Sequence, residues 1–86
     1  MPEISRFFGI VIQMYFNEHN PPHFHAEYQN YEAVICINDL RIVAGYLPPR
    51  PLALVLKWTE LHRKELLENW SEMRLEHSPK KIKPLE

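Results

Sequence analysis

The sequence predicts an α+β protein in which an antiparallel sheet of about four strands is followed by a long C-terminal helix packed on one face. Apolar and polar residues alternate through the first half of the chain, which is typical of half-buried strands. In the second half, apolar residues recur every three or four positions, which is typical of an amphipathic helix. The proline cluster 48–51 separates the two patterns, so strands and helix are segregated along the chain.

Polar turns divide the first half into the expected strands. The segment 17–22 is polar and contains two prolines, and Gln29-Asn30 and Asn38-Asp39 are short turn signals. Gly45 indicates a bulge or a close approach of the backbone. The strands are therefore expected at residues 9–16, 23–28, 31–37 and 40–47.

The helix is expected from Leu52 to about Glu76. A helix of about 25 residues would be ~38 Å long, which exceeds the width of a four-stranded sheet, so we expect a break or a projecting end. A second apolar stripe lies nearly opposite the first and is expected to contact a partner protein or a second copy of the chain. The alternative is that loops or the N-terminal segment cover this stripe. It consists of Leu54, Trp58 and Leu61.

The composition indicates one small domain at residues 1–78 and a flexible, basic and proline-containing tail at 79–86. The 86 residues are 45% hydrophobic and 24% charged, which suits a folded chain that gains stability from a homodimer or a partner. The single cysteine, Cys36, and the lack of a signal-like or membrane-spanning segment predict a cytoplasmic protein with no membrane partner. A net charge of −1 lacks the basic excess that accompanies strong nonspecific nucleic-acid binding.

The densest group of chemically active side chains lies in the segment 19–27. Strand alternation places His23, His25 and Glu27 in one row, with neighbours ~7 Å apart at the backbone. His19 lies in the preceding loop, where two prolines restrict its freedom. Side chains at this spacing can converge on a shared metal ion or phosphate group.

Three uses of these histidines remain open. One is acid–base chemistry without a metal, in which Arg41 or Arg50 stabilises negative charge on a phosphate. Another is a transition-metal site, since imidazole suits zinc, copper, nickel and iron. The third is an exposed strand face without a chemical role. The metal ligands would be His19, His23 and His25, with Glu27 able to complete the set.

Four segments carry a family resemblance: residues 2–10 (PEISRFFGI), 20–26 (NPPHFHA), 45–50 (GYLPPR) and 58–70 (WTELHRKELLENW). Together they resemble one bacterial family of short proteins, catalogued as a domain of unknown function, number 4160. The resemblance covers almost the whole chain. It implies a member of a two-gene module of the toxin–antitoxin type, in which a toxin-like component is paired with a small cognate partner protein.

The leading functional hypothesis is therefore a toxin-like component that cleaves RNA without a cofactor. The alternative is a non-catalytic module that binds a partner or a transition metal such as zinc. In the ribonuclease, two histidines would be base and acid, a carboxylate would orient one of them, and an arginine would hold phosphate. These residues are His23, His25, Glu27 and Arg50, with His19 and Arg41 as further binding residues.

Overall fold

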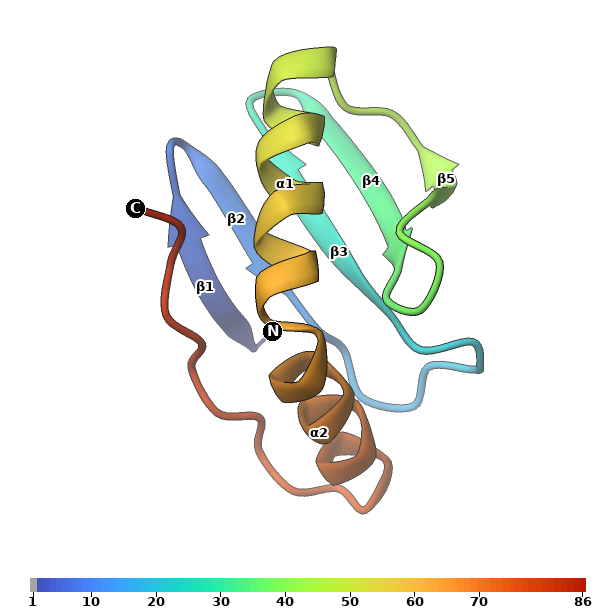
Figure 1. The fold of residues 1–86 in the computed structure, drawn as a ribbon. Coiled ribbons are helices and arrows are strands. Elements are labelled where there is room, and N and C mark those ends of the chain that lie inside the picture. The colour runs from blue at the N-terminus through green and yellow to red at the C-terminus, as the bar shows by residue number, and fades with distance from the viewer. Residues whose placement is uncertain (1) are drawn as a thin grey trace.

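The computed structural model describes residues 2–86, and Met1 lies outside the described residues. It confirms the α+β class: five antiparallel strands form one sheet in chain order, and two helices follow and lie across one face (Figure 1). The strands are β1 (Glu3–Phe7), β2 (Ile10–Gln13), β3 (His23–Tyr28), β4 (Tyr31–Cys36) and β5 (Ile42–Gly45). The helices are α1 (Pro49–Leu61) and α2 (Arg63–Arg74).

The expected number of strands is one too low, because β1 was not predicted. Its burial does not alternate: Ile4 and Ser5 are adjacent and both buried, and the pairing with β2 shifts register between Glu3 and Ser5. A bulge of this kind removes the period of two by which strands are recognised. Phe8 and Gly9 then turn the chain with φ of 51° and 79°, as in a tight hairpin.

The histidine-bearing strand β3 is the middle strand of the sheet and pairs with β2 and β4. Its alternation is confirmed, since Phe24 and Ala26 are fully buried whereas His23 and His25 are partly exposed. The core lies between the sheet and the helices. Its largest fully buried side chain is Trp58, whose ring centroid lies 5.8 Å from that of Phe24.

The long helix of the prediction is broken, as its length led us to expect, and forms two helices separated at His62. The backbone N–H of His62 donates to the carbonyls of both Trp58 and Thr59, and φ and ψ of −120° and 22° end the helical geometry there. The molecule measures 34 × 25 × 23 Å, so a straight helix of ~38 Å would project beyond it. The break keeps Val55 of α1 and Leu66 of α2 in the same core. No helix within residues 2–86 has the length and apolar character needed to cross a membrane.

The segment 79–86, expected to be a flexible tail, lies along β1 and α1 (Figure 1). The N–H of Ile82 donates to the carbonyl of Ile4 at 2.8 Å, and the Ile82 side chain is buried. Asn69 exchanges two hydrogen bonds with the backbone of Lys80 at 2.8 and 2.9 Å. The indole N–H of Trp58 donates to the carbonyl of Lys83 at 2.9 Å. These contacts were not predicted, because the composition of the segment is polar and proline-rich.

Gly45 makes the close backbone approach that its position predicts. It has a φ of 78°, and a Cβ added there would lie 2.1 Å from the carbonyl oxygen of Glu32. Gly9 has a similar φ of 79°, but an added Cβ would only reach ordinary contact with the ring of Tyr28. Substitution of each glycine by alanine therefore distinguishes the cost of the left-handed backbone, which both positions share, from the cost of steric overlap, which arises only at Gly45.

We predict that Gly45→Ala lowers the free energy of unfolding much more than Gly9→Ala. The left-handed conformation costs either alanine ~1–2 kcal/mol, and only Gly45→Ala adds an overlap with backbone that cannot rotate away. Denaturant titration of the two variants measures the difference. Equal losses would show that β4 and β5 do not approach each other as described.

Candidate histidine–carboxylate site

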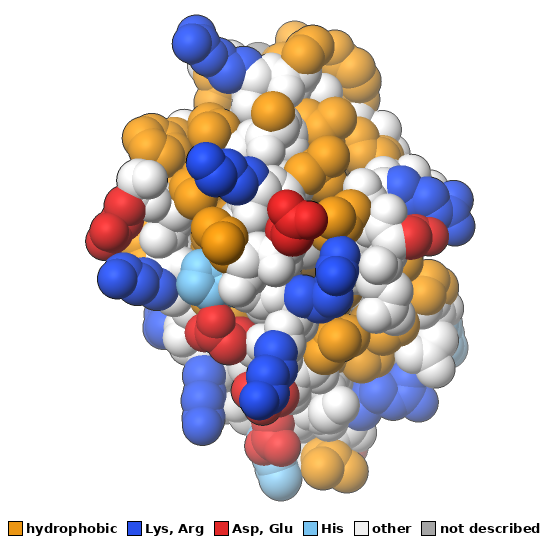
Figure 2. All heavy atoms as spheres, viewed as in Figure 1, with side chains coloured by type: hydrophobic (Ala, Val, Ile, Leu, Met, Phe, Trp, Pro, Cys, Tyr) orange, Lys and Arg blue, Asp and Glu red, His pale blue; other side chains and the backbone are white. Residues whose placement is uncertain are grey.

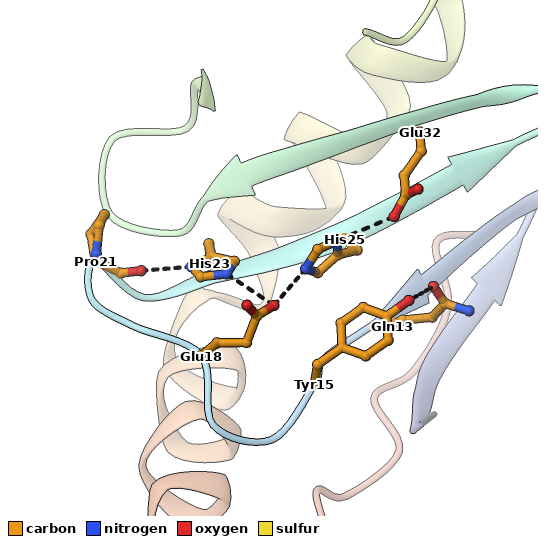
Figure 3. Close-up of polar contacts among 7 residues, drawn as sticks. All are labelled: Gln13, Tyr15, Glu18, Pro21, His23, His25 and Glu32. Carbon is orange, nitrogen blue, oxygen red and sulfur yellow. Dashed lines mark hydrogen bonds and ion pairs between the residues drawn. The ribbon is translucent and has the colours of Figure 1, made fainter. Parts of the chain in front are cut away.

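Three side chains converge at the end of the sheet where β3 begins. The Glu18 carboxylate oxygen Oε1 lies 2.6 Å from Nε2 of His25 and 3.3 Å from Nε2 of His23 (Figure 3). One ligand atom from each residue falls within 4.8 Å of the other two. All three side chains are partly buried, at 12 to 29% exposed. We call this group the Glu18–His23–His25 cluster.

The loop between β2 and β3 brings Glu18 to the histidines. Asn17 has a φ of 63°, in the left-handed region that asparagine tolerates better than most residues. The Asn20-Pro21 peptide bond is cis. The loop folds back so that Glu18 faces the start of β3, where His23 and His25 project from the same side of the strand (Figure 3).

The second ring nitrogen of each histidine also has a partner. Nδ1 of His23 lies 2.8 Å from the carbonyl oxygen of Pro21, which can only accept, so Nδ1 carries the proton and donates it. Nδ1 of His25 lies 3.2 Å from a carboxylate oxygen of Glu32. The Nε2 atoms therefore face Glu18. In the neutral His23 ring, Nε2 carries a lone pair and no proton.

The surroundings of the cluster are acidic. The Tyr15 ring packs edge-on against His25, with centroids 4.4 Å apart, and its hydroxyl donates to Gln13 at 2.9 Å. Burial raises the pKa of Tyr15, and the nearby negative charges of three glutamates raise it further. These are Glu32, Glu27 and Glu18. The site therefore attracts cations more than it attracts phosphate.

The pKa of Glu18 reflects two opposing effects. Burial, the largest, raises it, but hydrogen bonds from His25 and His23 and the charges of these rings lower it more, so the net pKa lies below the ordinary 4.5. The carboxylate is thus held ionised between two rings that can carry positive charge.

Beside the cluster lies a cavity of about 300 Å³ between the β2–β3 loop and α2. Glu18 belongs to both the cluster and the cavity wall, and the His23 ring lies 5.0 Å from the ring of Trp70, which lines the cavity as well. The remaining lining residues are Tyr15, Asn17, His19, Met73 and Arg74.

Only part of the predicted catalytic set is brought together. His23 and His25 meet, but Glu27 is exposed and pairs in register with Glu32 rather than orienting a histidine. Arg50 lies in the first turn of α1, which begins at the end of the sheet opposite to the start of β3 (Figure 1). The other two predicted binding residues also lie outside the cluster: Arg41 is exposed and ion-paired with Asp39 at 2.6 Å, and His19 lines the cavity.

The predicted interface stripe is corrected at its central residue. Trp58 is fully buried, because Phe7, Phe24 and the C-terminal segment enclose it, and so it belongs to the core. Leu54 is partly buried against the same core, and only Leu61, at 64% exposed, is open to a partner. The stripe is therefore not a continuous exposed surface.

Glu18 and Glu32 contact the histidines of the candidate site but were not predicted from the sequence. Glu18 directly precedes His19, and a loop carboxylate beside a histidine cluster is a usable signal. Glu32 follows from hairpin register: Tyr28 pairs with Tyr31 across the turn, which sets Glu32 diagonally opposite His25 on the same face.

The fold and the cluster define a class: a small α+β protein with a two-histidine, one-carboxylate site at the end of an antiparallel meander. The chain belongs to the family described as a domain of unknown function (DUF4160), whose model matches residues 9–71. The matched part contains the whole Glu18–His23–His25 cluster together with Glu32. No curated protein and no solved structure matches the chain.

We predict that, because of Glu18, the free energy of unfolding of the metal-free protein decreases as the solution becomes acidic. Because its pKa is lower in the folded than in the unfolded chain, its stabilisation is present above pH 4.5 and lost as the pH falls through the folded-state value. Glu18→Gln should therefore lower the free energy of unfolding above pH 4.5, and its difference from wild type should shrink as the pH falls.

Denaturant titrations over a pH series, with a chelator present, measure this difference. Glu27→Gln is the matched control, since Glu27 is exposed and lies outside the cluster. A Glu18→Gln difference that does not change with pH would contradict the assignment.

Proposed function

We propose that the protein binds a divalent transition metal, zinc being the leading choice, through Nε2 of His23, Nε2 of His25 and a carboxylate oxygen of Glu18. The observation that carries this proposal is the carboxylate oxygen lying 2.6 and 3.3 Å from both Nε2 atoms. Imidazole nitrogen and carboxylate oxygen are common zinc ligands.

The spacing of the three atoms supports a shared ion. Donor atoms around a tetrahedral ion with bonds of ~2.1 Å lie ~3.4 Å apart. The contact of Glu18 with His23, at 3.3 Å, already has that length. The contact of Glu18 with His25, at 2.6 Å, has to lengthen by somewhat less than ~1 Å, which rotation of a partly exposed glutamate side chain can supply.

The outer contacts support the same ligand set. A histidine that binds a metal through one ring nitrogen usually donates its other N–H to a carbonyl or a carboxylate, which fixes the tautomer. His23 has this contact with the carbonyl of Pro21, and His25 has it with Glu32. His19 does not take the place of His23 or His25 as a ligand, because it lies in the cavity wall.

Three protein ligands leave a coordination position open, as in catalytic rather than structural zinc sites. Zinc in such a position lowers the pKa of a bound water to about 7 and so supplies a nucleophile for hydrolysis. The chain's own residues would orient the ion: Glu32 and Pro21 hold the rings, and Tyr15 packs against His25. Hydrolytic chemistry at this site is therefore part of the proposal.

Metal-independent cleavage of RNA by His23 and His25 is the competing proposal. It needs a cation near the rings to hold phosphate, whereas the nearest charged partners of the two histidines are the carboxylates of Glu18 and Glu32. Acidic and basic side chains are intermixed on the helix-covered face (Figure 2), whereas His23 and His25 project from the side of β3 opposite to the buried Phe24. Ribonuclease activity that survives a chelator and is lost in His23→Ala would favour this alternative.

The biological setting that we propose is a two-gene module of the toxin–antitoxin type, with this chain as the toxin-like component and a small partner protein that neutralises it. Its support is the family resemblance. In this setting the Glu18–His23–His25 cluster is the part of the chain that the partner would have to inactivate or cover.

We predict that the purified wild-type chain binds one zinc ion and that His23→Ala, His25→Ala and Glu18→Ala each weaken binding by more than ~100-fold. Loss of an outer partner alone typically costs 10–100-fold in affinity, and loss of a ligand costs more. Competition with a chromophoric chelator gives the affinity, and elemental analysis gives the stoichiometry.

The matched control for the zinc experiment is His62→Ala. His62 forms a comparable contact with Glu65, at 2.6 Å, but within the described part of the chain it belongs to no group of three potential metal ligands, and its loss should leave zinc binding unchanged. Zinc binding that survives in all three cluster variants, or that is lost with His62, would contradict the proposed site.

We predict that wild-type chain expressed alone arrests growth of a bacterial host, and that a His23→Ala/His25→Ala double variant does not. His62→Ala should arrest growth like wild type, and circular dichroism should show that all three chains fold. Normal growth with the folded wild-type chain would exclude an autonomous toxin in that host without bearing on zinc affinity.

A further inference from the structure

We propose that the open position of the metal faces the cavity beside α2 and takes an anionic ligand of the phosphate class, which Arg74 helps to bind. This inference rests on the proposed metal site and adds the chemistry of what binds to it. The cavity of about 300 Å³ is at the lower limit of small-molecule pockets, which suits a phosphate group or a small phosphoester.

The cavity borders the cluster directly. Glu18 contributes to its wall, and the ring of His23 lies 5.0 Å from that of Trp70 in the same wall. An ion held by Glu18 and the two histidines is covered on one side by β3 and β4, which carry His25 and Glu32. Glu18 would bind the ion and also lines the cavity, so a fourth ligand of the ion can extend into this space.

The charges in the cavity differ from those around the histidine rings. Glu27 and Glu32, which make the sheet side acidic, do not line it. Its one carboxylate is Glu18, which a divalent ion neutralises, and its one permanent cation is Arg74. The metal and Arg74 together leave a net positive charge in the cavity, and so the metal-loaded protein attracts an anion that the metal-free protein does not.

Arg74 lines the cavity and is free for this role. It lies in the last turn of α2 and is exposed, and no ion pair with it occurs among residues 2–86. A guanidinium group can donate two parallel hydrogen bonds to phosphate oxygens. Asn17 and His19 add polar groups to the wall, while Trp70 and Met73 are almost fully buried and provide an apolar floor.

The experiment uses the full chain loaded with cobalt(II), an ion that takes zinc-type ligands and absorbs visible light, and inorganic phosphate as the probe. Phosphate should shift the cobalt spectrum of wild type in a saturable way and should not bind detectably to the metal-free chain. Arg74→Gln should weaken phosphate binding by ~10- to 100-fold, as expected for loss of hydrogen bonds from a charged group, with cobalt affinity unchanged.

Lys57→Gln is the matched control, because it removes one exposed cation from α1, outside the cavity, and should change neither affinity. If wild type binds cobalt but phosphate does not shift its spectrum, or if Arg74→Gln binds phosphate as wild type does, this inference is overturned and the metal site stands. Failure of wild type to bind cobalt or zinc would overturn both.

Discussion

The Glu18 carboxylate is the point on which the functional end of this molecule depends. It lies between two histidines of one strand and ties the long β2–β3 loop to the middle of the sheet. Without it the histidine rings would keep their contacts with Pro21, Glu32, Trp70 and Tyr15, but among residues 2–86 the loop would lose its ion pairs with β3. The cavity would also lose the one carboxylate that residues 2–86 contribute to its wall, since Glu18 belongs to both the cluster and the cavity.

When both histidine rings are neutral, this arrangement lacks the positive charge that a metal ion would supply. The neutral His23 ring, with its proton on Nδ1, directs a lone pair at an ionised carboxylate, and Glu32 adds negative charge on the far side of His25. Protonation of the rings reduces this repulsion, and so does a divalent cation bound between the three donor atoms. Protons and the metal ion compete for the same lone pairs, and so metal affinity at such sites falls as the pH is lowered.

Local periodicity made part of this structure predictable from the sequence. The alternation of Phe24 and Ala26 with His23 and His25 follows from the geometry of a strand. The position of Gly45 predicted a bulge or a close backbone approach, and the structure shows such an approach to Glu32. Contacts between distant segments carry no such signal. Burial of Trp58 depends on a tail that returns from the end of α2, and Glu18 reaches the cluster only because of the path of its loop. In β1, the bulge and the polar residues Glu3, Ser5 and Arg6 likewise removed the pattern by which a strand is recognised.

A zinc titration followed by the ring-nitrogen NMR signals of the five histidines in the chain tests whether Glu18, His23 and His25 share one metal ion. Before zinc is added, His23 should carry its proton on Nδ1. Zinc should then move the Nε2 signals of His23 and His25 while those of His62 and His77 stay unchanged. Zinc-dependent shifts confined to other histidines, or none at all at saturating zinc, would contradict the convergence of Glu18, His23 and His25 on one metal ion.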